Sequence, residues 1–375
     1  MFVDVDNLAN EFYLEVIKTR VLVIIATDVD AVAACRILQQ LFHSDNALYT
    51  LVPVSKKAAV AAAYRDHCEG IKNVVLLNCG ATWDVIEECK PEDDDVVFYI
   101  ADSNRPVHIH NVYNTSQVRL LMPSLPEEGV PAYEDLFRED EDDDEDEMSI
   151  EEVADRRRER REWEERRKQL LFEYTEFSYH GKSTAVTMFE MSWKMTRDTP
   201  EILWWAIIGQ SEQYISGKIE HNRYCKQQYA SMDINLRNNV KEWMCNMAEK
   251  YGLENLLFAC FTGKCGYRDH FFASDAAFGL MALLESPVDD VTTNFFNALD
   301  ALSWSNTELL RSGIQLAKER LVATTQQVHS FMDLGSIICA GPFLYSTVQE
   351  GAQHTVLVYK QDRGKFLDAL VSLLV

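Results

Sequence analysis

Polar side chains follow three short apolar runs in the first part of the sequence. Asp28 and Asp30 follow Val21–Ala26, Asn78 follows Asn73–Leu77, and Asp102, Ser103 and Asn104 follow Val96–Ala101. If these runs are strands of one parallel sheet, their carboxyl ends meet at one edge, where open α/β proteins bind ligands. Three carboxylates would then converge there, and carboxylate oxygens are ligands for hard divalent cations. The chemistry to consider is metal-dependent cleavage of a phosphoester.

Three carboxylates are too few for a pair of catalytic ions. A two-metal site holds its ions about 3.5 to 4 Å apart with several carboxylates, usually together with histidines. Here Asn78 is a neutral amide, and His108 and His110 lie further along, in what we expect to be another extended segment. Three interpretations stay open. Asp28 and Asp102 accept backbone hydrogen bonds or cap helices, the edge binds one residual cation, or it holds a working two-metal centre.

Other catalytic motifs are absent from the sequence. Neither GxGxxG nor GxxxxGK[ST] occurs, so no phosphate-binding loop is predicted. No GxSxG elbow occurs, and Cys79 has no nearby histidine to make it a nucleophile. Cys260, Cys265 and His270 are too loosely spaced for zinc, and buried thiols explain the cysteines better. We therefore expect no cofactor and no bound metal.

Charge and composition restrict the partners. With 36 basic and 60 acidic residues among 375, the net charge is −24, so the chain as a whole repels nucleic acid and anionic membranes. The best apolar runs, Val21–Ala26 and Leu203–Ile208, are too short to span a membrane. Nine scattered cysteines without a close CxxC pair indicate a reducing compartment. The length predicts two to three domains.

Short apolar runs alternate with helix-like stretches over the first third of the chain. Strands are predicted at Val21–Ala26, Tyr49–Val54, Asn73–Leu77 and Val96–Ala101, with helices at Leu8–Lys18, Ala31–Phe42 and in the alanine-rich stretch through Ala63. This alternation is typical of βαβ units and predicts a parallel sheet covered by helices on both faces. We therefore predict an open α/β domain over residues 1–135.

A run of nine acidic residues, Glu139–Glu147, is followed by a stretch of mixed charge. The run has nothing apolar to bury, so residues 136–149 are predicted to be a disordered acidic loop. It serves as a solvated spacer, as a decoy for basic partners or as a cover over a DNA-facing groove. Charges at helical spacing over Ile150–Leu170, such as Glu162 and Arg166, predict a long exposed helix stabilised by its own ion pairs.

Helical periodicity dominates after Tyr174. Helices are predicted at Ala185–Met195, Pro200–Ile208, Leu236–Lys250, Asp275–Leu284 and Thr307–Phe331; strands are predicted at Ser336–Cys339, Phe343–Val348 and Thr355–Tyr359, followed by a helix at Phe366–Leu374. We predict that residues 150–224 complete the N-terminal lobe, that residues 225–332 form a helical inter-domain region, and that residues 333–375 form a small α/β segment.

The strand-end motifs resemble those of the DHH phosphoesterase superfamily, which includes the nuclease RecJ. Ala26–Ala31 (Ala-Thr-Asp-Val-Asp-Ala) is similar to the first motif, with Ala26 in place of its leading acid or histidine. Residues 78–80 (Asn-Cys-Gly) match the second metal motif without its carboxylate, and residues 102–104 (Asp-Ser-Asn) match the Asp-His-His signature without its histidines. The resemblance implies that these positions are a vestigial metal site, and that the C-terminal segment is DHHA1-like.

Longer matches resemble one eukaryotic branch of this superfamily, the cell division control protein 45 family. They include residues 26–38, 49–54, 130–137, 203–207 and 341–345. The resemblance implies a nuclear, non-catalytic DNA replication factor. Such a factor joins the minichromosome maintenance hexamer and the GINS tetramer to form and activate the replicative helicase, alongside DNA polymerases. Members of the family are longer, so the joins Tyr224–Cys225 and Lys360–Gln361 are predicted to lack residues.

Two alternatives to this non-catalytic role remain. A residual metal-dependent exonuclease or phosphodiesterase would use Asp28, Asp30 and Asp102, and a single-stranded DNA-binding module would use Arg36 and Arg105. Core packing explains the adjacent tryptophans, at positions 204 and 205, better than base stacking does. On the long helix, whose basic stretch could also bind phosphate or an import receptor, the candidate partner-contact residues are Arg156, Arg160, Trp163 and Arg167.

Overall fold

The computed structural model describes residues 1–123, 129–138, 150–219, 262–265, 269–304, 306–333, 338–340, 343–350 and 353–360. Contacts divide the chain into unit 1, Met1–Ala259, and unit 2, Cys260–Val375. The finer domain boundaries expected from the sequence stay predictions. The acidic run Glu139–Glu147, the predicted helices Leu236–Lys250 and Phe366–Leu374, the join Tyr224–Cys225 and the residue that follows Lys360 lie outside the described residues.

Unit 1 contains a five-stranded parallel sheet with the strand order β2-β1-β3-β4-β6. The strands are β1 (Val21–Ala26), β2 (Tyr49–Val54), β3 (Asn73–Leu77), β4 (Val97–Ala101) and β6 (Val118–Leu120). Val21 pairs with Tyr49 on one side and with Asn73 on the other, so the carboxyl ends of the central strands lie level. The predicted parallel sheet is confirmed.

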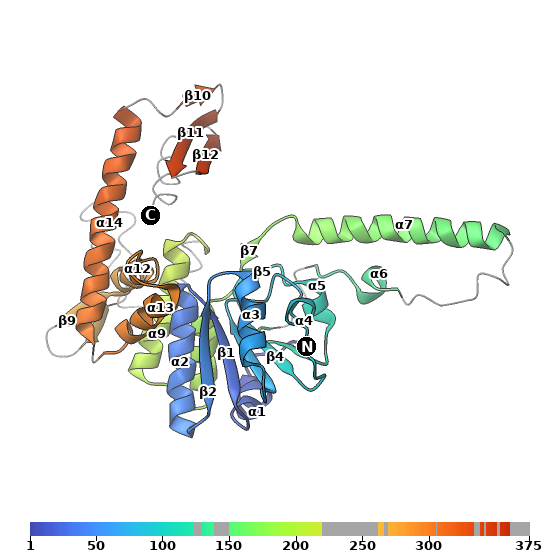
Figure 1. The fold of residues 1–375 in the computed structure, drawn as a ribbon, viewed down its shortest axis with the longest axis horizontal. Coiled ribbons are helices and arrows are strands. Elements are labelled where there is room, and N and C mark those ends of the chain that lie inside the picture. The colour runs from blue at the N-terminus through green and yellow to red at the C-terminus, as the bar shows by residue number, and fades with distance from the viewer. Residues whose placement is uncertain are drawn as a thin grey trace, which may run out of the picture. The chain divides into compact units, whose positions relative to one another are not determined.

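Helices cover both faces of this sheet (Figure 1). One face packs on α3 (Lys57–His67), α4 (Val85–Cys89) and α5 (Ile109–Tyr113). The other face packs on α2 (Val29–Asp45) and on the first residues of the chain, which form the π-helix η1 (Leu8–Tyr13) and α1 (Leu14–Val16). Both faces are buried, and for this reason the central strands read as continuous apolar runs.

The expectation that His108 and His110 lie in an extended segment is wrong. His108 is the N-cap of α5 and His110 lies within it, and Ile109 and Val112, three positions apart, are both buried. A five-residue helix spans little more than one turn. It therefore leaves too short a pattern for periodicity to distinguish it from a strand.

The long charged helix is confirmed as α7 (Ile150–Thr175), and α8 (Thr184–Lys194) and α9 (Pro200–Ile215) follow it. Between α7 and α8 lies β7 (Tyr179–His180), which pairs antiparallel with β5 (Asn104–Arg105). A short helix, α6 (Tyr133–Leu136), precedes α7. The two-residue strands and α6 are too short to leave a pattern in the sequence.

Unit 2 mixes helices and antiparallel strands. Its helices are α12 (Ala273–Leu284), α13 (Val291–Ala301) and α14 (Thr307–Asp333), and its strands are β8 (Thr262–Cys265), β9 (Asp269–Phe272), β10 (Ile338–Ala340), β11 (Phe343–Glu350) and β12 (Gln353–Lys360). The region predicted to be helical, residues 225–332, also contains the β8–β9 hairpin, which the sequence did not indicate because its local pattern is weak and cross-strand pairing decides its conformation. No helix of the described residues is long and apolar enough to cross a membrane.

Gly209 lets α9 pack closely on α2 and α8. A Cβ atom there would lie 2.7 Å from Asp30 Oδ1 and 2.7 Å from Ala185 Cβ. We expect Gly209→Ala to lower the free energy of unfolding by roughly 1–3 kcal/mol in urea titrations, although alanine favours helix more than glycine does. The control is Leu203→Ala on the same helix, 40% exposed, with an expected effect of about 0.5 kcal/mol. Equal effects of the two changes would contradict the close packing.

Candidate functional site

Asp30 is the centre of the site and is fully buried in the first turn of α2. Its Oδ1 accepts hydrogen bonds from Ser183 Oγ (2.5 Å) and Ala185 N (3.0 Å). Its Oδ2 accepts hydrogen bonds from Asn78 Nδ2 (3.1 Å) and Thr184 N (2.9 Å). A carboxylate has about four lone-pair positions. Donors from the protein therefore occupy the full accepting capacity of Asp30.

The N-terminus of α8 supplies three of these four donors. Ser183 is the N-cap of this helix, and its Oγ also accepts a hydrogen bond from Val186 N (3.3 Å). The first amides of a helix have no partner within the helix, and the helix dipole places partial positive charge there. The N-terminus of α8 thus stabilises the buried negative charge of Asp30. In a metal site, a bound cation would stabilise such a charge.

Asn78 connects the two aspartates that follow β1. Its backbone is in the left-handed region (φ 51°), which asparagine tolerates better than most residues. Its Nδ2 donates to Asp28 Oδ1 (2.9 Å) as well as to Asp30, and its Oδ1 accepts a hydrogen bond from Thr184 Oγ1. An amide can donate to both carboxylates, whereas a third carboxylate here would repel them.

Asp28 caps α2 through a hydrogen bond from Ala31 N to its Oδ1 (2.8 Å). Burial, together with the negative charge of Asp30, raises the pKa of Asp28 to about 7. Lys218 acts in the opposite direction, and its Nζ lies 2.8 Å from Glu212 Oε1. The site therefore resists a second negative charge near neutral pH.

Asp102 organises the loop that follows β4. Its Oδ2 accepts a hydrogen bond from Ala81 N (3.1 Å), and its Oδ1 accepts from Asn104 N (2.9 Å) and Asn104 Nδ2 (2.8 Å). Burial raises the pKa of Asp102 in spite of these hydrogen bonds and the nearby Arg105. Ser103 is buried, and its carbonyl oxygen accepts a hydrogen bond from Gly181 N (2.7 Å). The predicted capping and loop-binding roles of Asp28 and Asp102 are confirmed.

A cavity of about 300 Å³ opens at this edge of the sheet. Asp28, Asn78 and Asp102 line it together with Lys56 and Lys57, whereas Asp30 is not a lining residue. The three aspartates that the sequence places at one edge thus do not all face one cavity. No group of three or more histidine, cysteine, aspartate or glutamate side chains in the described part of the chain is placed to hold a metal ion. The donor set around Asp30 fits a capped carboxylate better than a cation.

Cys79 also lines this cavity. Burial, with the nearby charges of Asp102 and Asp28, raises the pKa of its thiol well above the ordinary value. The thiolate is the nucleophilic form of cysteine. The thiol is therefore protonated at neutral pH, in keeping with the expectation that it is no nucleophile.

The two arginines predicted to contact DNA both make contacts within the protein. Arg36 Nη1 donates to Gln39 Oε1 (2.7 Å), and its guanidinium lies 5.4 Å from the ring centroid of Trp205. Arg105 is only 6% exposed and donates to the carbonyl oxygens of Asp102 and Asn104. The two tryptophans, 204 and 205, are buried, as their core interpretation predicts. Contact between these arginines and DNA stays a prediction.

Ion pairs along α7 join residues four positions apart, as predicted, but Glu162 pairs with Arg158 and not with Arg166. Arg158 Nε lies 3.1 Å from Glu162 Oε1, so the partner of this glutamate lies on the turn before it and not on the turn after it. Among the predicted partner-contact residues, Arg160 Nε lies 3.4 Å from Glu164, Arg167 stacks over Trp163 at 5.8 Å, and the side chain of Arg156 lies outside the described part.

Sequence reasoning missed the residues that complete the site from a distance: Ser183, Thr184, Gly209, Glu212 and Lys218. One signal was available, because a Ser-Thr step directly before an apolar helical pattern is typical of an N-cap. The pattern locates the start of α8 but gives no indication that this helix end meets a residue 153 positions earlier.

The parallel sheet, with polar groups at its strand ends, defines an open α/β protein, as the sequence predicts. A sequence model of the CDC45 family matches residues 21–155, 127–224 and 223–363. The chain belongs to the CDC45 family.

Individual relatives agree with this assignment. The human cell division control protein 45 homolog is 33% identical over 458 residues, covering 94% of this chain and 81% of that protein. The Schizosaccharomyces pombe homolog is 22% identical over 398 residues, covering 70% and 62%. The crystal structure of CDC45 from Entamoeba histolytica matches with a TM-score of 0.63 at 15% identity, covering 99% and 82%, and this likeness shows the fold.

The raised pKa of Asp28 predicts a pH-dependent cost. In the unfolded chain this carboxyl titrates near pH ~3.9, and in the folded chain near 7. The folded state therefore binds more protons between these values, so this group lowers stability as pH rises through the window. We expect Asp28→Asn, which keeps the acceptor oxygen, to match the unsubstituted chain at pH ~4 and to exceed its free energy of unfolding by about 1–2 kcal/mol above pH ~7.

Urea titrations at several pH values measure this difference. A difference that does not change with pH, or an asparagine variant that is less stable at high pH, would contradict the assignment of the raised pKa to Asp28.

Proposed function

We propose that the chain is a non-catalytic DNA replication factor, a pseudo-enzyme of the DHH-like class that acts in the nucleus through its surfaces. Membership of the CDC45 family supports the general role in replication. The finer role is assembly with the minichromosome maintenance hexamer and the GINS tetramer into the active replicative helicase, next to other replisome proteins such as DNA polymerases.

The single observation that carries the non-catalytic part is the saturated carboxylate of Asp30. All four of its hydrogen bonds come from the protein, at 2.5 to 3.1 Å. A metal ion would have to displace several of these donors and leave buried amides unpaired, at roughly 1–3 kcal/mol for each group. The protein thus already supplies the positive environment that an ion would otherwise bring.

The remaining strand-end groups support the same conclusion. Asn78 contributes an amide where a two-metal site needs charge, and the residues that follow Asp102 are Ser103 and Asn104, which are weak cation ligands. The raised pKa of Asp28 leaves it partly protonated near pH 7, which removes further ligand charge. Such a site stabilises the fold, and the outer surfaces are left to perform the function.

A nuclease assay tests the catalytic alternative. We expect the intact chain with manganese to release no more nucleotide from labelled single-stranded DNA than its Asp102→Ala variant does, because neither holds a pair of ions. A second readout is calorimetric titration with manganese, which we expect to give no saturable heat. Manganese-dependent release that is abolished by Asp102→Ala would overturn the proposal.

Assembly is tested by reconstitution. We expect the chain to elute with purified minichromosome maintenance hexamer and GINS tetramer as one complex in size-exclusion chromatography, and the Asp28→Asn variant to do so equally, because Asp28 lies at the strand-end cavity and not on an outer helix. Failure of the intact chain to join either complex would contradict the assembly role and leave the nuclease result to be judged separately.

A further inference from the structure

A second cavity in unit 1 lies where α5, α6 and the last turns of α7 come together. Its volume is about 490 Å³, and Thr82 is the one lining residue that it shares with the strand-end cavity, as far as the structure describes them. Tyr174 Oη donates to Val107 O (2.8 Å), which joins α7 to the segment before α5. Two arginines and two histidines line the cavity, and none of its described lining residues is acidic.

Three lining residues of this cavity carry a buried nitrogen atom without a hydrogen-bond partner. These atoms are Arg105 Nε and Arg167 Nε, which are donors, and His108 Nδ1, which donates or accepts according to the tautomer. Arg105 is 94% buried, since its exposed fraction is 6%, and its Nη1 is held by two backbone carbonyls, so the guanidinium is fixed in place. An arginine Nε–H can only donate. The two arginines therefore fit a ligand that brings acceptor oxygens and negative charge.

The other histidine already has a partner. His110 Nδ1 lies 3.0 Å from Asp84 Oδ2, so this nitrogen is not available to a ligand. Arg167 stacks over the ring of Trp163 without any described carboxylate partner. Net positive charge at the cavity thus comes from Arg105 and Arg167.

Apolar side chains form a further part of the lining, next to hydroxyl groups such as that of Tyr174. The apolar residues come from α5 and the segment before it, from α6 and the residue after it, and from α7: Val107, Ile109, Leu136, Phe137 and Leu171. A lone inorganic anion would satisfy the donors and leave this surface in contact with water. The lining therefore suits a ligand that combines carboxylates with one apolar group.

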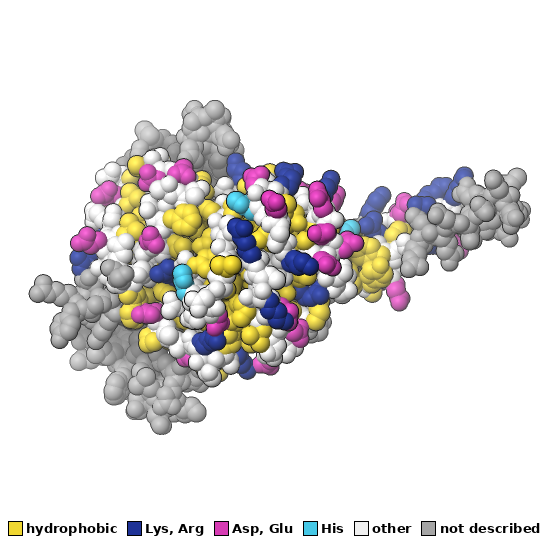
Figure 2. All heavy atoms as spheres, turned by 60° about the horizontal axis from the view of Figure 1, so that its bottom comes forward, with side chains coloured by type: hydrophobic (Ala, Val, Ile, Leu, Met, Phe, Trp, Pro, Cys, Tyr) yellow, Lys and Arg dark blue, Asp and Glu magenta, His cyan; other side chains and the backbone are white. Residues whose placement is uncertain are grey.

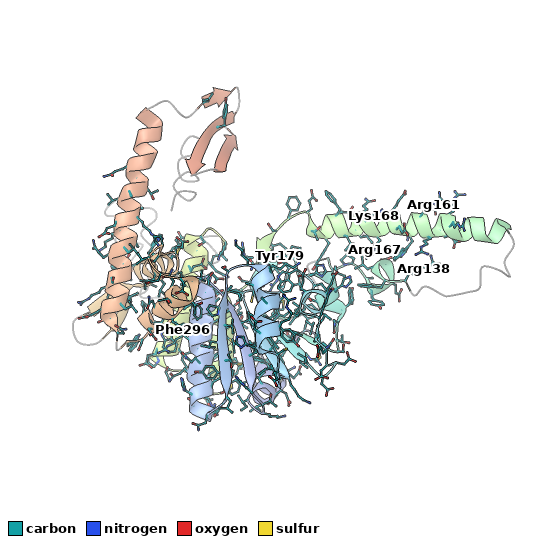
Figure 3. All side chains as sticks on the ribbon, in the orientation of Figure 1. Arg138, Arg161, Arg167, Lys168, Tyr179 and Phe296 are labelled. Atoms are coloured by element: carbon teal, nitrogen blue, oxygen red, sulfur yellow. The ribbon has the colours of Figure 1, made fainter. Side chains whose placement is uncertain are left out.

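Arg138 extends the positive charge beyond the cavity. It follows Phe137, is exposed, and has no ion-pair partner among the described residues. Figure 3 shows Arg138 and Arg167 on the side where α6 and α7 face each other, with Arg161 further along α7 and turned away. In the space-filling view, Lys and Arg side chains follow α7, and hydrophobic side chains lie at its base (Figure 2).

We propose that this cavity binds a short acidic peptide segment of another protein. Its carboxylates accept hydrogen bonds from Arg105 and Arg167, and one apolar side chain packs against Phe137 and Leu171. Arg138 attracts the acidic residues that flank this anchor. Charge complementarity selects such a segment, because the cavity is basic within a chain of net charge −24.

A nucleic acid strand fits the same observations less well. It carries a charge at every nucleotide, and its phosphates make no use of the apolar lining. The proposal does not rest on the non-catalytic function, because an active phosphoesterase could carry the same cavity. An experiment that contradicts peptide binding thus leaves the proposed function untouched, and the reverse also holds.

The test measures fluorescence anisotropy of the fluorescein-labelled peptide Glu-Asp-Glu-Phe-Asp-Glu with the intact chain. We expect saturable binding with a Kd below about 1 mM. Replacing the peptide's phenylalanine by alanine is expected to weaken binding about tenfold, since one buried aromatic side chain is lost. Arg167→Glu is expected to weaken binding at least about tenfold, and Arg138→Glu about fivefold.

The matched control is Arg161→Glu, which makes the same charge change on the same helix outside the cavity. We expect it to change the Kd by less than about twofold. Circular dichroism checks the fold of each variant. If Arg167→Glu does not fold, Arg138→Glu at its exposed position still decides the matter.

Four outcomes would overturn the proposal. The first is absence of saturable binding. The second is an equal loss in Arg161→Glu and Arg138→Glu, which indicates unspecific attraction. The third is tighter binding of an oligothymidine that is also lost in Arg167→Glu, which makes the cavity a nucleic-acid site. The fourth is peptide affinity that rises more than about tenfold when residues 139–147 are deleted, which makes the chain's own acidic run the occupant.

Discussion

The fold of unit 1 depends on how one buried carboxylate is balanced. A charge without partners in a protein interior costs several kcal/mol, and Asp30 is fully buried. The balance comes from the residue that follows β3, through the side-chain amide of Asn78, and from the start of α8, through two backbone amides and a hydroxyl. Because these donors belong to separate elements, the charge fixes the position of α8 against the sheet. Gly209 then allows α9 to pack on both.

The strand-end aspartates have structural roles that do not require a bound ion. In an open parallel sheet the strand ends present backbone groups that need partners, and aspartates there satisfy them. Asp28 caps α2, and Asp102 holds the loop after β4. Each of these side chains has a structural reason to stay whether or not an ion binds. Their presence alone is therefore weak support for a catalytic role.

Much of unit 1 was predictable, because its central strands are buried on both faces and read as apolar runs bounded by helical periodicity. Short elements were not predictable. The helix that holds His110, the β5–β7 pair and the β8–β9 hairpin are each too brief to leave a period, and tertiary contacts decide their conformation. The strand-end residues of the site could be predicted, because their positions follow from the predicted strands. Ser183 and Lys218 could not, because no local pattern encodes a contact across more than a hundred residues.

The β5–β7 pair has a consequence for how sequences of this family can differ in length. Asn104 pairs with His180 and Arg105 with Tyr179, so the chain leaves and re-enters unit 1 at neighbouring points. The stretch between these points includes α5 and β6, which belong to the sheet layer, so only the part between the end of β6 at Leu120 and the start of β7 at Tyr179 lies outside it. Doubling the length of a flexible loop costs only about 0.6 kcal/mol of closure entropy. Insertions and deletions between β6 and β7 can therefore accumulate over evolution while the sheet stays unchanged.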